Sequence, residues 1–118
     1  MATYSKVALS GSTNGKQIKV DQSSSSGTLI HTAQSGTTYW DEVWIYAVNS
    51  SSTQVQKLTI QWGGTASPDD EIEVVIGTES GYVLVIPGLL LQNSLVVRAY
   101  STNANTILIN GYVNRISA

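Results

Sequence analysis

Turn-forming residues interrupt this chain so often that helices of useful length are excluded. Clusters of Gly, Pro, Asn or Ser recur about every eight to twelve residues, whereas an amphipathic helix needs apolar residues three and four apart over about ten positions or more. Between the clusters, Leu58, Ile60 and Trp62 alternate with polar residues, and residues 71–76 repeat the pattern. Alternation of this kind is the period of a half-buried β-strand, so the sequence predicts an all-β protein.

The runs between the turn-forming clusters predict eight strands and a ninth run. The strands are expected at residues 6–9, 17–21, 28–33, 43–49, 55–62, 71–76, 82–86 and 95–100. The ninth run, residues 106–116, is expected to be one long strand bent at Gly111. Short strands at this spacing favour a sandwich or barrel. The length of 118 residues fits one domain, with residues 1–15 as a candidate extended N-terminal arm.

Composition and charge exclude several classes of protein. Only 12% of the residues are charged, and the net charge is -2. The six Lys and Arg residues form no cluster, so we expect neither a nucleic-acid groove nor a contact with an anionic membrane. Cysteine is absent, which rules out disulfides and thiol catalysis. The longest apolar run, residues 82–91, is interrupted by Pro87 and Gly88 and is shorter than the roughly 20 residues that cross a bilayer.

Residues that could carry catalysis are few. His31 is the only histidine, and strand alternation predicts that it shares a face with Leu29 and Ala33. The Gly-x-Ser-x-Gly motif of serine hydrolases does not occur, and one histidine without cysteines does not make a zinc site. We therefore interpret His31 as a structural residue and expect no enzyme activity, no metal and no cofactor.

An acidic run, Asp69, Asp70 and Glu71, could supply oxygen ligands to Ca²⁺. It lacks the Asp-x-Asp-x-Asp-Gly spacing and the distal Glu of a specific calcium loop. The simpler interpretation is a turn that enters a strand, in which Pro68 fixes φ and Asp69 bonds to local amides.

Residues 43–48 are apolar at nearly every position, and two interpretations stay open. Either this is a central strand with one face in the core and the other under a loop, or one face meets a second subunit. The second interpretation uses Trp44 and Tyr46, or else Val43 and Ile45. Both interpretations require cover on two faces, because a strand with one wet face would alternate.

Three leucines, Leu89, Leu90 and Leu91, follow Pro87 and Gly88. Pro and Gly together favour a turn, so the segment is predicted to be a corner between strands. Its leucines either cap the sandwich or fill a subunit interface.

Four segments carry a resemblance to a known group of proteins. They are GTLIHTA at 27–33, DEVWIYAVN at 41–49, LTIQWGG at 58–64 and INGYVNRI at 109–116. With these segments the chain resembles the small virion structural proteins of tailed bacteriophages, and it is most similar to capsid decoration (cement) proteins of jelly-roll type. The resemblance covers most of the chain, in its overall pattern.

The resemblance implies an eight-stranded antiparallel β-sandwich, jelly-roll-like, that binds the major capsid protein as a homotrimer and stabilises the shell. It also implies synthesis in the host cytoplasm, since no signal peptide is visible, and a place on the capsid surface of the virion. An N-terminal capsid contact is expected at Thr3, Tyr4, Ser5 and Lys6. A subunit interface is expected at Val43, Trp44, Ile45, Tyr46, Leu89, Leu90 and Leu91.

The alternative function is a carbohydrate-binding module or a phage tail receptor-binding protein. Trp and Tyr side chains suit sugar platforms as well as protein interfaces. In this alternative, Tyr39 and Trp40, just before a predicted strand, form the platform for a glycan.

Overall fold

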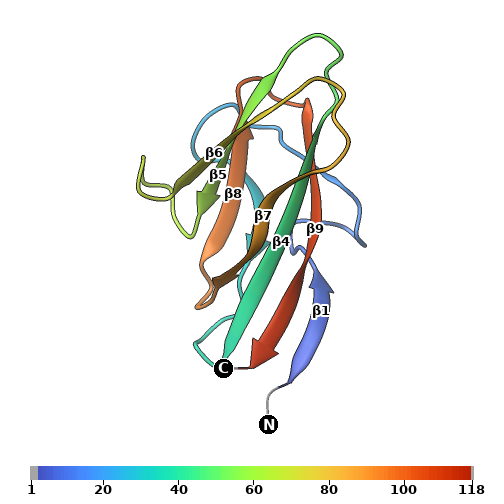
Figure 1. Ribbon diagram of the computed structural model, residues 1–118. Helices are drawn as coiled ribbons and strands as arrows, with labels where there is room; N and C mark the ends of the chain where they lie inside the picture. The colour runs from blue at the N-terminus through green and yellow to red at the C-terminus, as the bar shows by residue number, and fades with distance from the viewer. Residues whose placement is uncertain (1–2, 118) are drawn as a thin grey trace.

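Two antiparallel sheets packed face to face make up the structure, a computed structural model that describes residues 3–117 (Figure 1). The strands are β1 (Tyr4–Ala8), β2 (Ile18–Lys19), β3 (Thr28–Thr32), β4 (Tyr39–Asn49), β5 (Gln56–Trp62), β6 (Glu71–Ile76), β7 (Val83–Leu91), β8 (Val96–Ser101) and β9 (Ile107–Ser117). Over residues 3–117 there is no helix long and apolar enough to cross a membrane. The predicted all-β sandwich is confirmed.

The order of the strands is that of a jelly roll. One sheet has the order β1-β9-β4-β7, with β2 paired to a separate stretch of β9, and the other has the order β3-β8-β5-β6. β1 and β2 pair with different parts of β9, so these two short strands together occupy one position beside it. The nine strands therefore fill eight positions in the two sheets. Apart from the β5–β6 hairpin, consecutive positions alternate between the sheets. This is the double Greek key of an eight-stranded jelly roll.

Two strands, β4 and β7, extend four or more residues beyond their predicted bounds. β4 begins at Tyr39 rather than at residue 43, and β7 continues through Pro87 and Gly88 to Leu91. The predicted corner is therefore wrong. Within residues 3–117, β7 is an edge strand that pairs with β4 alone, so the missing N–H of Pro87 need not break the ladder. Gly88 accepts a φ of 80° in this strand without steric cost.

The inner faces of the two sheets form the core, and β4 contributes one side of it. Burial alternates along this strand: Val43, Ile45 and Ala47 are fully buried, whereas Trp44 and Tyr46 point outward and are half-buried. The apolar run in β4 is thus explained by a core face and an aromatic outer face.

β3 breaks the predicted alternation. Its register against β8 shifts between Leu29 and His31, so that Ile30 and His31 are both buried while Leu29 is 39% exposed. The prediction that His31 shares a face with Leu29 is wrong, because a β-bulge places an extra residue opposite its partner strand. His31 and Ala33 do both lie in the interior.

The candidate N-terminal arm contains β1 within its described part, residues 3–15. β1 pairs with β9 over five residue pairs, and the Thr3 N–H donates to Ser117 Oγ at 2.7 Å. Residues 1 and 2 of the arm lie outside the described residues. β1 therefore adds an edge strand to the sheet that contains β4 and β7.

Candidate binding face

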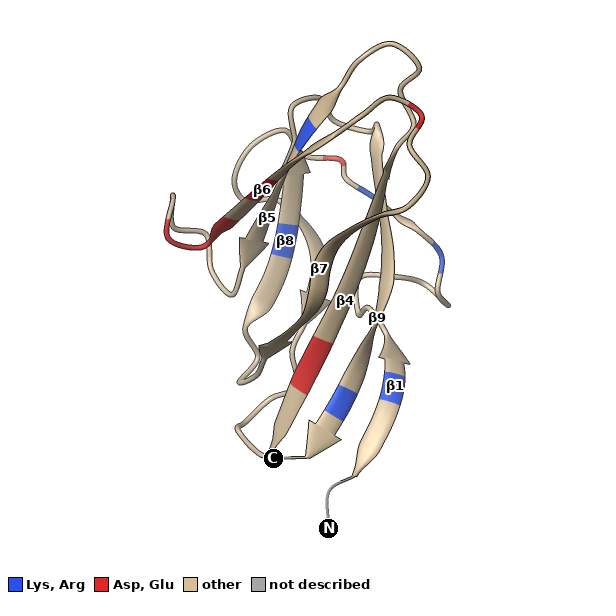
Figure 2. Cartoon of the chain, viewed as in Figure 1, with Lys and Arg blue, Asp and Glu red and all other residues tan. Residues whose placement is uncertain are grey.

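The solvent-facing side of the β1-β9-β4-β7 sheet collects most of the aromatic side chains of the chain. Residues that pair directly across antiparallel strands lie on the same face, and the outward-facing Trp44 pairs with Tyr112 and Pro87. Figure 2 shows that charges occupy only short stretches of β1, β4 and β9. We define the outer aromatic face as Tyr4, Lys6, Trp40, Glu42, Trp44, Tyr46, Tyr82, Leu84, Leu90, Asn110, Tyr112, Asn114 and Ile116.

A polar network fixes the orientation of Trp44 on this face. Its Nε1 donates to Glu42 Oε1 at 2.8 Å, and Asn114 Nδ2 donates to the same oxygen at 2.9 Å. The Tyr4 hydroxyl donates to Asn114 Oδ1 at 2.7 Å. The hydrogen bonds from Asn114 and Trp44 lower the pKa of Glu42 and outweigh the opposing effect of burial. The network therefore links β1, β9 and β4 across the face.

The rings at the centre of the face lie close together. The centroids of Trp44 and Tyr112 are 6.2 Å apart and their planes differ by 18°. Gly88 leaves room for the indole, since a Cβ at this position would lie 2.8 Å from Trp44 Cζ2. The Lys6 ammonium lies 4.6 Å from the centre of the Tyr112 ring, in a cation–π contact. Side chains from β1, β9 and β4 thus meet in one aromatic surface.

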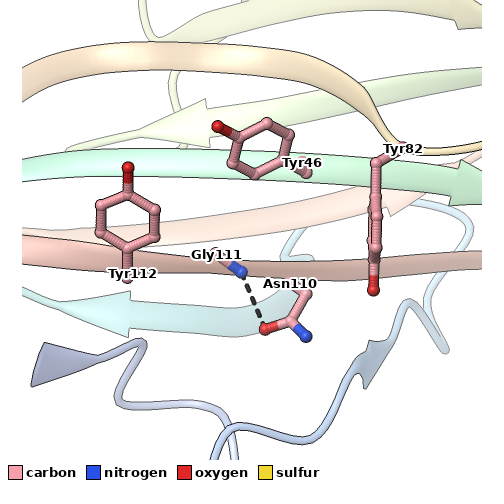
Figure 3. A pocket seen from close by; sticks show the side chains of 5 residues that line it. All are labelled: Tyr46, Tyr82, Asn110, Gly111 and Tyr112. Carbon is pink, nitrogen blue, oxygen red and sulfur yellow. Dashed lines mark hydrogen bonds between the residues drawn. The ribbon is translucent and has the colours of Figure 1, made fainter.

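A shallow groove of about 260 Å³ opens at the end of the face that carries Tyr82. Its lining consists of Tyr46, Tyr82, Asn110, Gly111 and Tyr112 (Figure 3), and we call it the tyrosine groove. Tyr46 and Tyr82 meet edge to face, with centroids 6.2 Å apart and planes at 71°. None of these five lining residues is charged. A small, neutral, aromatic recess is the result.

The predicted subunit interface is wrong at three of its residues. Val43 and Ile45 are fully buried and Leu91 is 5% exposed. They pack into the core of their own chain, so a second subunit cannot reach them.

The other four residues of the predicted interface are accessible. Trp44 and Tyr46 lie on the outer aromatic face, and Leu89 and Leu90 are exposed on the edge strand β7. Their role between subunits stays a prediction.

The predicted capsid-contact residues lie at the β1 edge of the same sheet. Tyr4 and Lys6 belong to the outer aromatic face, whereas Ser5 pairs with the inward-facing Arg115 and Thr3 precedes the strand. All four are exposed. The structure therefore brings part of the predicted capsid contact and part of the predicted subunit interface onto one face.

Tyr39 and Trp40 do not form a joint platform. They are the first two residues of β4, and successive residues of a strand point to opposite faces. Trp40 pairs with Ile116 on the outer aromatic face, and Tyr39 pairs with Ser117 on the other side. A platform made of both rings is therefore wrong.

Sequence reasoning missed the grouping of Tyr82, Asn110 and Tyr112 with Tyr46. One signal was present: Asn110 and Tyr112 alternate with apolar residues in the last predicted strand, which places them opposite its core face. The pairing of β9 with β4 was not visible, since it joins residues far apart in the sequence.

A buried charged cluster lies on the inner side of β4 and β9. Arg115 Nε donates to Asp41 Oδ1 at 2.8 Å and Nη2 donates to Oδ2 at 3.0 Å. His31 Nε2 lies 2.8 Å from Asp41 Oδ2, and the Gln34 N–H donates to that oxygen at 3.2 Å. The Ser10 N–H donates to His31 Nδ1 at 3.0 Å. Because Nδ1 is an acceptor, Nε2 carries the proton and donates it to Asp41.

The protonation states in this cluster follow from burial and charge. Burial lowers the pKa of His31 and outweighs the hydrogen bond and the charge of Asp41. Burial by itself would raise the pKa of Asp41, but the hydrogen bonds from Arg115 and His31 lower it overall. His31 is 1% exposed, and Ser10 Oγ accepts the Thr32 N–H at 2.7 Å. We interpret the cluster as a structural link between β3, β4 and β9.

The stability of the protein is expected to fall as the pH drops below the ordinary His31 pKa of 6.5. Because the folded-state pKa is lowered, the unfolded chain takes up a proton near this pH while folded His31 stays neutral. The contribution is fully present above pH 6.5 and is lost by at most about 1.4 kcal/mol per pH unit below it. Urea unfolding between about pH 7.5 and 5.5 measures the slope. A His31→Gln variant is expected to lack this pH dependence of stability. A wild-type free energy of unfolding that does not change over this pH range would contradict the role given to His31.

The acidic run closes a turn through its own hydrogen bonds. Asp70 Oδ2 accepts the Ala66 N–H at 3.0 Å, and Glu71 Oε2 accepts the Tyr100 hydroxyl at 3.0 Å. The prediction that the Asp69 carboxylate accepts hydrogen bonds from local backbone amides is wrong, since the Asp70 carboxylate accepts the one from Ala66. Residues 3–117 contain no group of three or more His, Asp or Glu side chains that could hold a metal ion.

Comparison with models of known protein families and with curated protein sequences gives no match.

Proposed function

We propose that this chain is a capsid decoration protein of a bacteriophage, which binds the major capsid protein as a homotrimer through its outer aromatic face and so stabilises the shell. The observation that carries the proposal is the extent of apolar surface on that face. Tyr4, Leu84 and Leu90 are 63%, 44% and 49% exposed. Large contiguous apolar patches on a soluble domain mark interaction sites.

The energetics of this face favour a permanent partner. Full burial of one aromatic or Leu side chain contributes about 1.5–3 kcal/mol, and a partner covering the face would bury several of them. Few charges would have to be desolvated there, and each desolvated charge would need its own partner. Jelly rolls also occur in viral capsid and lectin domains. This last point is an analogy between folds and supports the class only.

We assign the two edges of the sheet to two different contacts. Leu84, Leu89 and Leu90 on β7 form the contact between copies, and Tyr4 and Lys6 on β1 contact the shell. Since β1 and β7 are opposite edges of one sheet, one chain presents two distinct patches. In a three-fold ring the contact between copies is heterologous, so the β7 patch of one copy would meet a different surface of the next copy.

The experiment that tests the function mixes the purified protein with matching capsids that lack it. We expect saturable attachment, seen by sedimentation, and a higher temperature of capsid rupture. Absence of saturable attachment, or attachment without any gain in capsid stability, would contradict the proposal.

The Leu90→Asp variant is expected to turn the trimer into a monomer, because a carboxylate would have to be desolvated in the contact between copies. Light scattering should report three times the 12.6 kDa of the chain for the wild type and 12.6 kDa for the variant. Val75→Asp is the matched control, since Val75 is 67% exposed on β6 of the other sheet. A monomeric wild type, or a trimeric Leu90→Asp variant, would contradict the assigned contact.

A further inference from the structure

We propose that the tyrosine groove is a saccharide-binding site that holds one ring of a neutral glycan. This inference goes beyond attachment to a capsid, and it concerns the free chain, because the groove shares Tyr46, Asn110 and Tyr112 with the outer aromatic face. The groove lies at the Tyr82 end of the outer aromatic face, where β4 and β9 present Tyr46 and Tyr112.

The shape of the groove suits a sugar ring. In Figure 3 the rings of Tyr46 and Tyr112 are seen face-on, whereas the ring of Tyr82 is seen edge-on. Tyr46 and Tyr82 are at 71° to each other, so two rings form a floor and the third forms a wall. Gly111 lies between them without a side chain. A pyranose presents a flat apolar C–H face to such a floor, and aromatic rings are amphipathic surfaces of the right kind.

The polar atoms at the rim match the hydroxyls of a sugar. The hydrogen bonds within residues 3–117 leave the Tyr46 and Tyr112 hydroxyls free to donate and accept. Tyr82 donates its hydroxyl proton to Gln17 Oε1 at 2.7 Å, which leaves the phenolic oxygen as an acceptor. Asn110 Nδ2 donates to Gly15 O at 3.2 Å and keeps a second hydrogen for a ligand.

Other ligand classes fit the groove less well. A charged ligand would meet no opposite charge in the five lining residues, and Lys6 contacts Tyr112 from β1 without lining the groove. A proline-rich peptide presents only carbonyl acceptors to an aromatic groove, so it would leave the acceptor on the Tyr82 phenolic oxygen unused. Hydroxyl groups both donate and accept, so a sugar can use the phenols that remain.

The volume of the groove limits how much of a glycan it can hold. About 260 Å³ is below the roughly 300–1,000 Å³ of pockets that enclose drug-sized molecules. One ring therefore occupies the groove, and the rest of the glycan extends out of it into solvent. We expect a Kd of about 1 mM for a single ring, since small ligands gain little binding free energy.

The test is an NMR titration of the ¹⁵N-labelled full chain with five probes: maltotriose, chitotriose, N-acetyllactosamine, the anionic sialyllactose and a decaproline peptide. We expect saturable shifts of the Gly111 and Tyr112 amides with at least one of the three neutral oligosaccharides. Tyr82→Ala, at a 55% exposed position, and Tyr46→Ala should each weaken this binding about tenfold. The control Tyr100→Ala changes a tyrosine on β8 of the other sheet and should leave glycan binding unchanged.

Three outcomes would overturn the inference. They are no saturable shift with any neutral probe up to about 10 mM, binding of sialyllactose or decaproline alone, and neutral-glycan binding that survives Tyr82→Ala and Tyr46→Ala. Attachment to capsids is measured separately, so failure of the glycan site and failure of the decoration function can be told apart.

Discussion

The Asp41→Ala variant is expected to lose about 3–5 kcal/mol of its free energy of unfolding, the usual cost of removing one partner from a buried ion pair. Asp41 is fully buried and accepts hydrogen bonds from Arg115, His31 and Gln34. Without the carboxylate, the buried imidazole N–H and the half-buried guanidinium lose their acceptor. The penalty therefore comes from the donors that are left behind.

Urea unfolding at neutral pH measures this loss. Asp69→Ala is the matched control, because Asp69 is exposed in the turn before β6, and an exposed substitution usually changes stability by less than about 0.5 kcal/mol. A loss below about 1 kcal/mol for Asp41→Ala would mean that water replaces the carboxylate and that the cluster is not a structural link.

The Gly111→Ala variant is expected to lose about 3 kcal/mol or more, at or above the upper end of the usual cost of overpacking. A Cβ at this position would lie 2.0 Å from the carbonyl oxygen of Trp44 and 3.1 Å from Ile45 Cα. Both are backbone atoms of β4, and neither can rotate away as a side chain would. The two strands would have to separate where they form eleven consecutive residue pairs.

Thermal unfolding followed by circular dichroism measures the effect of Gly111→Ala. Gly81→Ala is the control, since a Cβ there would meet no atom within 4 Å. Equal stability of the two variants would show that β4 and β9 approach less closely than described. Because Gly111 also lines the tyrosine groove, glycan binding is better tested with the tyrosine variants.

Both substitutions act on the same pair of strands. Asp41 pairs with Arg115, and Ile45 pairs with Gly111, on the inner side of the β4–β9 ladder. The outer side of that ladder carries Trp44 and its neighbours. One strand pair therefore supplies stability on one face and binding surface on the other, because side chains alternate across a sheet.

The strand pattern was predictable because it is local. Turn-forming clusters and alternation indicated the strands, including the complete span of β6 (Glu71–Ile76). Errors arose where a special backbone feature overrode the pattern. The bulge in β3 turned His31 away from the face of Leu29, and the edge position of β7 allowed the strand to run through Pro87.

The binding face was only partly predictable. Trp44 and Tyr46 followed from the apolar run in β4, but sequence alone could not choose between them and Val43 with Ile45. The choice depends on which face the second sheet covers, which is a long-range property of the fold.

The sequence by itself determined the all-β class, most of the strands and the scarcity of charged side chains, because residue type and spacing act within each short run. Only the tertiary structure decided which side of β4 faces solvent, that Asp41 would meet Arg115, and that Tyr46, Tyr82 and Tyr112 would line one groove. The physical reason is that alternation specifies which residues share a face of one strand. Strand order and register then decide which faces come together, and these are set by contacts between distant parts of the chain.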